Sequence, residues 1–284
     1  MKELMGLGTA LITPFKADKS VDYEALARLL DTQLTGSVDY IVVLGTTGEA
    51  ATMTTEEKRE VRTFIRKYVN GRLPLVLGVG GNNTAAVCET LRTMDLSGFE
   101  AILSVCPYYN KPNQEGLYQH FCAVAEASPV PVILYNVPGR TGVNLLPETV
   151  MRIYEAQPDK IAAIKEASGN VEQIKHLIDL AKDKLLVISG DDGIACEIME
   201  AGGAGLISVA SNAFPEDFCD IVHKKDQAKQ AQYDNMVKLL FKEGNPVGIK
   251  AVLAQKGIIQ NYLRLPLVPA SKDLQEEIQK EMAK

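Results

Sequence analysis

Eight short apolar segments recur along the chain, and they constrain its fold more than any other feature. They span residues 7–12, 40–44, 75–79, 101–105, 132–135, 161–164, 185–188 and 205–209. Most of them are almost continuously apolar, whereas a strand with one face in solvent would alternate apolar and polar residues. Continuous runs of this kind are typical of parallel strands that are covered on both faces. The pattern therefore predicts an α/β protein.

The segments between the apolar runs carry the signals of helix starts. Thr54 with Glu57, and Asn170 with Gln173, fit the capping box that opens a helix. Strand and helix alternate in eight units of about 20–35 residues, which favours a (β/α)8 TIM barrel over residues 1–225. A doubly wound open sheet is the competing architecture, because alternation alone does not show closure. Residues 226–284 keep a helical period and predict a C-terminal helical extension packed on the barrel.

Composition argues against several classes of protein. The 284 residues carry a net charge of −6 without a basic cluster, so no nucleic-acid partner is expected. Thr9, Thr13 and Pro14 interrupt the apolar N-terminal stretch, which predicts a strand and not a signal peptide. No run approaches the ~18 apolar residues of a membrane span, and we expect a cytoplasmic protein. The five cysteines and three histidines lack ligand spacing, so no metal site is expected.

A lysine ends the sixth apolar run, in the segment IAAIKEASGN at residues 161–170. In a barrel of this kind the working residues lie at the C-terminal ends of the strands and in the loops that follow. Water is partly removed from a lysine that points into the barrel mouth, which favours the neutral, nucleophilic amine. The competing interpretation is that Lys165 extends into solvent or pairs with Glu166.

Polar groups also follow other predicted strands. Tyr135 ends the fifth run, where a phenol can transfer protons, although a packed aromatic residue is the better explanation when the position is taken alone. The segment GTTGE at residues 45–49 offers backbone N–H groups for a carboxylate or phosphate, or is simply a tight turn. Arg140 lies in the loop after the fifth run, where its planar fork would fit a carboxylate or remain solvated.

Taken together, these strand ends resemble the dihydrodipicolinate synthase/N-acetylneuraminate lyase family of Schiff-base-forming barrel enzymes. The matching segments extend over nearly the whole chain: GTTGE at 45–49, YYNKP at 108–112, YNVPGRTG at 135–142, IKEASGN around Lys165, SGDD at 189–192 and GLISV at 205–209. The resemblance implies that Lys165 is the nucleophile. It also implies that no cofactor is needed, because pyruvate binds covalently as a Schiff base.

Arg140 and the two threonines of GTTGE resemble the branch of the family that acts in lysine and diaminopimelate biosynthesis. That branch condenses pyruvate with L-aspartate 4-semialdehyde to give 4-hydroxy-tetrahydrodipicolinate. The resemblance implies that Thr46 and Thr47 bind the pyruvate carboxylate and that Arg140 binds the carboxylate of the aldehyde. The positions of Gly190 and Ile207 match residues whose backbone lines the pyruvate pocket.

Three residues resemble the proton relay of the family: Tyr135, Thr47 and Tyr109. In the family, the tyrosine that matches Tyr109 comes from a neighbouring subunit across a tight dimer, and two dimers usually form a tetramer. The resemblance therefore implies a homotetramer in which one chain alone is an incomplete enzyme.

This chain departs from the family pattern at positions that are linked to feedback inhibition by L-lysine. Family members that L-lysine inhibits usually carry His or Glu where this chain has Thr55, Lys58 and Ala86, although Asn82 and Tyr108 match. A cationic effector would meet Lys58 and no glutamate, so weak or absent inhibition is expected.

Two other functions remain open at this point. Another pyruvate-dependent aldolase, such as an N-acetylneuraminate or 2-keto-3-deoxy sugar acid lyase, would share Lys165 and Tyr135 but not need Arg140. A non-catalytic sugar-acid or amino-acid binding protein on a degenerate barrel would need none of these residues. Lys250, in a helical segment after GNPVG, is the lysine with which Lys165 should be compared.

Overall fold

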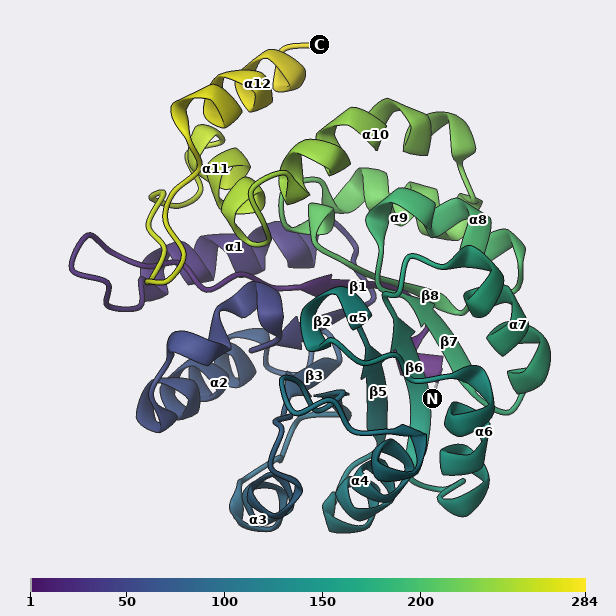
Figure 1. The fold of residues 1–284 in the computed structure, drawn as a ribbon. Coiled ribbons are helices and arrows are strands. Elements are labelled where there is room, and N and C mark those ends of the chain that lie inside the picture. The colour runs from purple at the N-terminus through teal and green to yellow at the C-terminus, as the bar shows by residue number, and fades with distance from the viewer. Residues whose placement is uncertain (1) are drawn as a thin grey trace.

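Eight parallel strands close into one barrel in chain order (Figure 1). The computed structural model describes residues 2–284. The strands are β1 (Gly6–Ala10), β2 (Tyr40–Val43), β3 (Leu75–Gly78), β4 (Ala101–Val105), β5 (Val132–Asn136), β6 (Ile161–Glu166), β7 (Leu186–Ser189) and β8 (Gly205–Ser208). β8 pairs with β1, with Leu206 opposite Leu7. The predicted TIM barrel is therefore confirmed, and the open sheet is wrong.

Helices alternate with the strands and surround the barrel. They are α1 (Tyr23–Thr35), α2 (Thr55–Val69), α3 (Thr84–Thr93), α4 (Gln114–Ala127), α5 (Pro138–Thr141), α6 (Pro147–Ala156), α7 (Val171–Ala181), α8 (Ala195–Glu200) and α9 (Pro215–Lys224). Short 3-10 turns are η1 (Lys2–Leu4), η2 (Thr46–Gly48), η3 (Ala50–Thr52), η4 (Asp192–Ile194) and η5 (Ala210–Asn212). None of the helices among residues 2–284 is both long and apolar enough to cross a membrane.

One of the two predicted capping boxes is complete. At the start of α2, Glu57 N donates to Thr54 Oγ1 over 3.1 Å, and Thr54 N donates to the Glu57 carboxylate over 2.9 Å. At the start of α7, Asn170 accepts from Gln173 N over 3.1 Å, but the Gln173 side chain turns to Glu166. The return bond predicted for the second box is therefore wrong, because Gln173 Oε1 accepts from Asn144 Nδ2 over 2.7 Å and Asn170 N donates to Ser168 Oγ over 3.2 Å.

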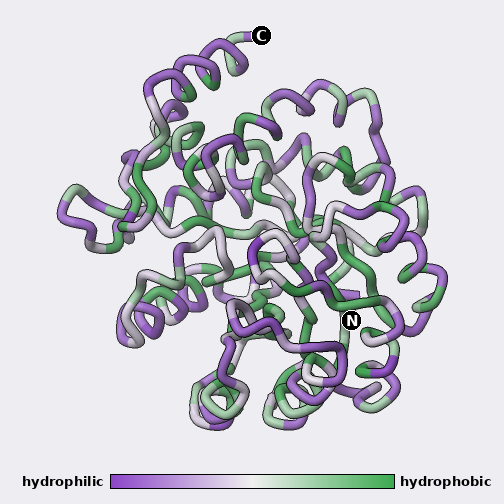
Figure 2. Tube along the Cα trace, in the orientation of Figure 1, coloured by the Kyte–Doolittle hydropathy of each residue, from purple (hydrophilic) through white to green (hydrophobic). Residues whose placement is uncertain are grey.

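The apolar core has two parts, one inside the barrel and one between the barrel and its helices. Figure 2 shows hydrophobic residues along the strands and hydrophilic residues on the outer turns of the helices. Successive strand residues point to opposite faces, so Ala163 belongs to the inner core and Ile164 to the outer one. The same alternation directs Lys165 into the barrel and Glu166 toward the helices.

Three helices follow the barrel and lie on one side of it (Figure 1): α10 (Gln227–Phe241), α11 (Val247–Gln255) and α12 (Lys272–Met282). α10 packs on α8 and α9, and α11 contacts η5. A Cβ atom on Gly248 would lie 2.5 Å from Leu240 O, so this glycine lets α11 pack closely against α10. The predicted division between residues 225 and 226 stays a prediction; Asp226 is the N-cap of α10.

Candidate active site

Lys165 and Tyr135 meet inside the barrel near the C-terminal ends of their strands. The two residues are direct partners in the pairing of β5 with β6. The Lys165 Nζ lies 4.4 Å from the centre of the Tyr135 ring. Each residue is only 6% exposed. Among the described residues, Lys165 forms no ion pair, so its amine is held beside a phenol without a carboxylate partner.

Glu166 points away from Lys165 and belongs to a separate polar cluster. Its carboxylate accepts from Asn136 Nδ2 over 2.9 Å, from Ser168 N over 2.8 Å and from Gln173 Nε2 over 3.3 Å. Burial raises the pKa of the Glu166 carboxyl above its usual value. The interpretation that Lys165 pairs with Glu166 is therefore contradicted, because the strand alternation separates the two side chains.

Gly190 and Ile207 complete the surroundings of the lysine. A Cβ atom on Gly190 would lie 2.9 Å from Lys165 Cε and 2.6 Å from Ala167 Cβ, so only glycine leaves the lysine its space. Gly190 N donates to Glu166 O over 2.8 Å, which joins the loop after β7 to β6. Ile207 is fully buried in the inner core of the barrel. Their contribution to a pyruvate pocket stays a prediction.

The GTTGE segment forms η2 and divides into an exposed and a buried threonine. Thr46 is exposed, whereas Thr47 is 3% exposed. Gly48 N and Glu49 N donate back to Gly45 O and Thr46 O. The first N–H groups of a helix have no hydrogen-bond partner within it. An anion bound at this turn would therefore accept hydrogen bonds from the N–H groups of Thr46 and Thr47. No described contact joins Thr47 to Lys165 or Tyr135.

Asn245 contacts this turn from the C-terminal extension, and sequence reasoning missed it. Its Nδ2 donates to Thr47 Oγ1 over 2.9 Å, and the residue is 6% exposed. The available signal was the segment GNPVG at residues 244–248, whose glycine and proline interrupt a long helical stretch. That signal locates a turn but does not show which distant residue the turn contacts.

Glu49 contacts two residues of the C-terminal extension, Lys250 and Arg264. Its backbone is left-handed, with φ of 53°, and its buried carboxylate pairs with Lys250 Nζ. Lys250 also donates to Tyr262 O over 3.0 Å and lies 4.2 Å from the centre of the Phe15 ring. Burial lowers the pKa of Lys250 to about 8, against the opposing effect of Glu49. Lys250 is thus a buried lysine with partners, unlike Lys165.

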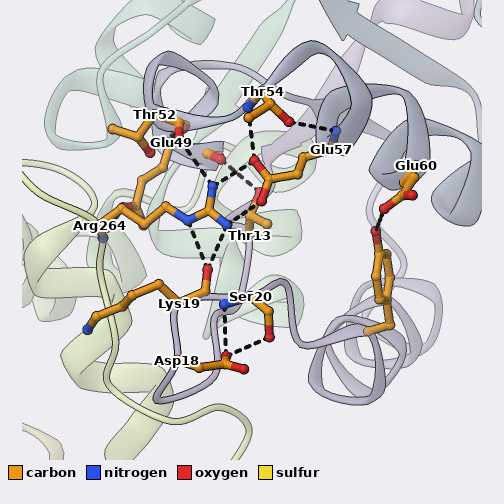
Figure 3. A network of polar contacts seen from close by, with 12 residues as sticks. Thr13, Asp18, Lys19, Ser20, Glu49, Thr52, Thr54, Glu57, Glu60 and Arg264 are labelled. Atoms are coloured by element: carbon orange, nitrogen blue, oxygen red, sulfur yellow. Dashed lines mark hydrogen bonds and ion pairs between the residues drawn. The ribbon is translucent and has the colours of Figure 1, made fainter.

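Arg264 joins the same turn to α2 (Figure 3). Its backbone N donates to Glu49 Oε2 over 3.1 Å, and its guanidinium donates to both carboxylate oxygens of Glu57. The guanidinium also donates to Thr52 O and to Lys19 O. Hydrogen bonds from Arg264 lower the pKa of Glu57 to about 2. The extension therefore holds the turn that contains Thr47 in place.

Tyr109 and Arg140 lie on the surface of the single chain. Tyr109 is 89% exposed and has a left-handed backbone with φ of 75°. Its N–H donates to Thr141 O over 3.4 Å, which brings its loop beside α5 and the exposed Arg140. Neither side chain has a described contact with Lys165, Tyr135 or Thr47. Their roles in binding and proton transfer stay predictions.

The positions that bear on L-lysine lie in the loop before α3 and in the first turns of α2 and α3. Asn82 Nδ2 donates to Tyr108 O over 3.1 Å. Thr55 and Lys58 lie in the first turn of α2, and Ala86 is exposed near the start of α3.

Among the described residues, no group of three His, Cys, Asp or Glu side chains is arranged to bind a metal ion.

Comparisons with known proteins identify the family of this chain. The model of the dihydrodipicolinate synthetase family matches residues 3–284. A 4-hydroxy-tetrahydrodipicolinate synthase of Parabacteroides distasonis is 51% identical over 273 residues, which are 94% of this chain and 92% of the relative. A chloride-inhibited dihydrodipicolinate synthase from Acinetobacter baumannii, complexed with pyruvate, is 39% identical with a TM-score of 0.94, covering 99% of this chain and 98% of that one.

A second solved structure is a monomeric dihydrodipicolinate synthase variant. It is 37% identical with a TM-score of 0.94 and covers 99% of this chain and 96% of that one. The match to the family model includes every strand of the barrel and all three helices of the C-terminal extension. The chain belongs to the dihydrodipicolinate synthetase family.

Proposed function

We propose that this chain condenses pyruvate with L-aspartate 4-semialdehyde to give 4-hydroxy-tetrahydrodipicolinate, through a Schiff base on Lys165. The observation that carries the proposal is the buried amine of Lys165, which lies 4.4 Å from the Tyr135 ring centre. The names of the relatives support the choice of reaction. Nothing in the site or in these relatives favours a sugar-acid lyase or a binding protein.

In the first half of the reaction, Lys165 forms the covalent intermediate. Its amine attacks the keto carbon of pyruvate, and the resulting carbinolamine loses water to give an imine. The protonated imine withdraws electrons from the neighbouring methyl group, which loses a proton to give an enamine. Because Lys165 has no carboxylate partner among the described residues, no ion pair has to break before the attack.

In the second half, the enamine carbon attacks the aldehyde of the second substrate and a carbon–carbon bond forms. The imine is regenerated, the amino group of the second substrate then displaces Lys165, and the ring closes. Arg140 lies on α5, directly after β5 and therefore at the same end of the barrel as Tyr135. Its guanidinium suits a bidentate contact with the carboxylate of the aldehyde.

Proton transfer in this proposal uses Tyr135, Thr47 and Tyr109. Tyr135 is adjacent to the reacting amine, and Thr47 is buried in the turn after β2. Tyr109 is 89% exposed on one chain, which supports its insertion into the site of a second subunit. We therefore propose a homo-oligomer, a tetramer built from two dimers, in which each dimer completes its own sites.

The proposed chemistry needs no cofactor, because the Schiff base itself accepts the electrons. The reaction belongs to lysine and diaminopimelate biosynthesis, and that metabolic role supports a location in the cytoplasm.

Replacement of Arg140 by alanine tests the choice of substrate. Product formation is measured in a coupled assay with pyruvate and L-aspartate 4-semialdehyde. Because a charge-assisted bidentate contact is lost, kcat/KM for the aldehyde is expected to fall by roughly tenfold to a hundredfold. Borohydride trapping of pyruvate on Lys165 is expected to remain at the wild-type level, since Arg140 does not contact the lysine.

Arg152 provides the matched control. It is an exposed arginine on α6 that pairs with Glu115 over 3.0 Å. The Arg152→Ala variant is expected to keep both product formation and trapping. If Arg140→Ala retains the wild-type kcat/KM for the aldehyde, the assignment of Arg140 is wrong.

Feedback by L-lysine is expected to be weak or absent. The first turn of α2 presents Lys58 at a position where a cationic effector would need an acidic or neutral partner. Like charges repel the effector, and Ala86 offers no carboxylate to compensate. Steady-state rates with L-lysine in the assay are the measurement, and inhibition at micromolar concentrations would contradict the expectation.

A further inference from the structure

We propose that Asn136 is a positioning residue: held by the Glu166 carboxylate, it fixes the loop that carries Arg140 relative to Lys165. This inference rests on the proposed function, in which Arg140 binds the carboxylate of the aldehyde. The loop spans residues 137–146, between β5 and α6, and contains α5. Because Arg140 lies on this loop and not on a strand, its place relative to the lysine depends on how the loop is held.

Two residue pairs follow each other at the ends of β5 and β6. The strand register pairs Tyr135 with Lys165, and the next position pairs Asn136 with Glu166. Successive strand residues point to opposite faces, so the second pair lies directly behind the first, on the helix side of the barrel. Both of its members are fully buried. Any segment that this outer pair binds is therefore fixed relative to the lysine.

The Asn136 side chain closes the loop that carries Arg140. Its Oδ1 accepts from Leu145 N over 2.9 Å, and its Nδ2 donates to Asn144 Oδ1 over 2.8 Å. Asn136 directly precedes the loop, whereas Asn144 and Leu145 lie near its far end. Within the loop, Arg140 N donates to Val137 O over 2.9 Å. One amide thus joins both ends of the segment, and the arginine lies on the turn between them.

The Glu166 carboxylate determines which way the Asn136 amide faces. Asn136 Nδ2 donates to Glu166 Oε2 over 2.9 Å, and Ser168 N donates to Glu166 Oε1 over 2.8 Å, so both oxygens act as acceptors. With oxygen and nitrogen of the amide exchanged, the Asn136 oxygen would face the carboxylate and the NH2 group would face Leu145 N–H. Both hydrogen bonds would be lost in a buried place, where unpaired polar groups are costly. Glu166 therefore holds the amide in the orientation that closes the loop.

The surrounding segments are tied to the same two residues. Ala167 N, directly after β6, donates to Asn136 O over 2.9 Å. Asn144 Nδ2 donates to Gln173 Oε1 over 2.7 Å, which attaches the far end of the Arg140 loop to α7. The loop is thus held from β5, β6 and α7 together, with Asn136 and Glu166 at the centre of the contacts.

A double-mutant cycle in kcat/KM for the aldehyde tests whether Asn136 acts through Arg140. The variants are Asn136→Ala, Arg140→Ala and the two combined. Loss of the hydrogen bonds that close the loop predicts a fall of roughly fivefold to tenfold for Asn136→Ala. The change is expected in KM for the aldehyde, while KM for pyruvate stays constant. In the Arg140→Ala background, Asn136→Ala is expected to change kcat/KM by less than about twofold, and additive losses would overturn the inference.

Glu166→Gln tests the carboxylate and keeps the inference testable if Asn136→Ala does not fold. A glutamine has one acceptor oxygen in place of two, so either Asn136 Nδ2 or Ser168 N loses its acceptor. KM for the aldehyde is expected to rise by roughly threefold to tenfold, again with KM for pyruvate unchanged. A wild-type KM for the aldehyde in this variant would show that the carboxylate does not set the loop and would overturn the inference.

Gln33 provides the matched control. It is equally buried, and its amide also joins two elements: Thr9 Oγ1 of β1 donates to its oxygen over 2.8 Å, and its nitrogen donates to Asn212 O of η5 over 3.2 Å. Gln33→Ala is expected to lower the midpoint of thermal unfolding but to leave KM for the aldehyde unchanged. An increase in this KM as large as that in Asn136→Ala would show that loss of any buried amide has the effect, and the role of Asn136 would be wrong.

Borohydride trapping with pyruvate, run on every variant, separates this inference from the proposed function. Trapping on Lys165 in Asn136→Ala and Glu166→Gln is expected to match the wild type, because the imine forms before the aldehyde binds. If the wild type itself neither traps pyruvate nor makes product, the proposed function fails and the role of Asn136 fails with it. If the wild type does both and the cycle is additive, only the role of Asn136 fails.

Discussion

Borohydride reduction in the presence of pyruvate is expected to attach one reduced pyruvate to Lys165, and Lys165→Ala is expected to abolish both this adduct and product formation. The loss of activity should reach at least about a thousandfold, because without the nucleophile the covalent route is removed entirely. Peptide mass spectrometry locates the adduct, and the coupled assay measures the rate. Lys165→Arg, which keeps a cation in the same place, is expected to be equally inactive, because a guanidinium is not a nucleophile.

Lys250 is the internal control for this experiment. Like Lys165, it is buried and lies near an aromatic ring, 4.2 Å from the centre of Phe15. It differs because Glu49 and Tyr262 O already bind its ammonium group. The peptide that contains Lys250 should remain unmodified. An adduct on Lys250, or an unchanged adduct yield in Lys165→Ala, would refute the Schiff-base mechanism.

The second large effect concerns stability. Lys250→Met is expected to lower the free energy of unfolding by about 3–5 kcal/mol, because it leaves the buried Glu49 carboxylate without its counter-charge. For a domain of this size, the midpoint of thermal unfolding should fall on the order of 10 °C. Glu49→Gln combined with Lys250→Met should be more stable than Lys250→Met alone, since the uncompensated charge is then removed.

An exposed ion pair gives the matched comparison for that measurement. Lys242, the C-cap of α10, pairs with Glu277 of α12, and its side chain is 50% exposed. Lys242→Met should change the free energy of unfolding by less than about 1 kcal/mol, because water and salt screen exposed pairs. A Lys250→Met variant as stable as the wild type would show that the buried pair does not hold the extension on the barrel.

Local patterns predicted much of the fold correctly. The continuous apolar runs located all eight strands within a few residues, because covered parallel strands need apolar side chains on both faces. The Thr54–Glu57 box was found because its partners are three residues apart. The Asn170–Gln173 box was only half right, since the Gln173 side-chain oxygen accepts from Asn144, which lies in the loop before α6.

The candidate site was predicted in part. Strand alternation in IAAIKE places Lys165 and Glu166 on opposite faces of the strand. The sequence alone does not show which face points into the barrel and which points toward the helices. Asn245 was missed because a Gly-Asn-Pro turn does not reveal which distant residue it touches. Tyr109 and Arg140 remain on the surface of one chain, and their proposed contacts need a substrate or a second subunit.

The alternation of strands and helices, the helix cap at Thr54 and the position of Lys165 at a strand end could all be predicted from the amino-acid sequence. These features depend on the period of the side chains and on partners within a few residues. The closure of the barrel, the pairing of Glu49 with Lys250 and the hydrogen bond from Asn245 to Thr47 became evident only in the folded chain. Such contacts join residues far apart in the chain, and they exist only once the extension has packed on the closed barrel.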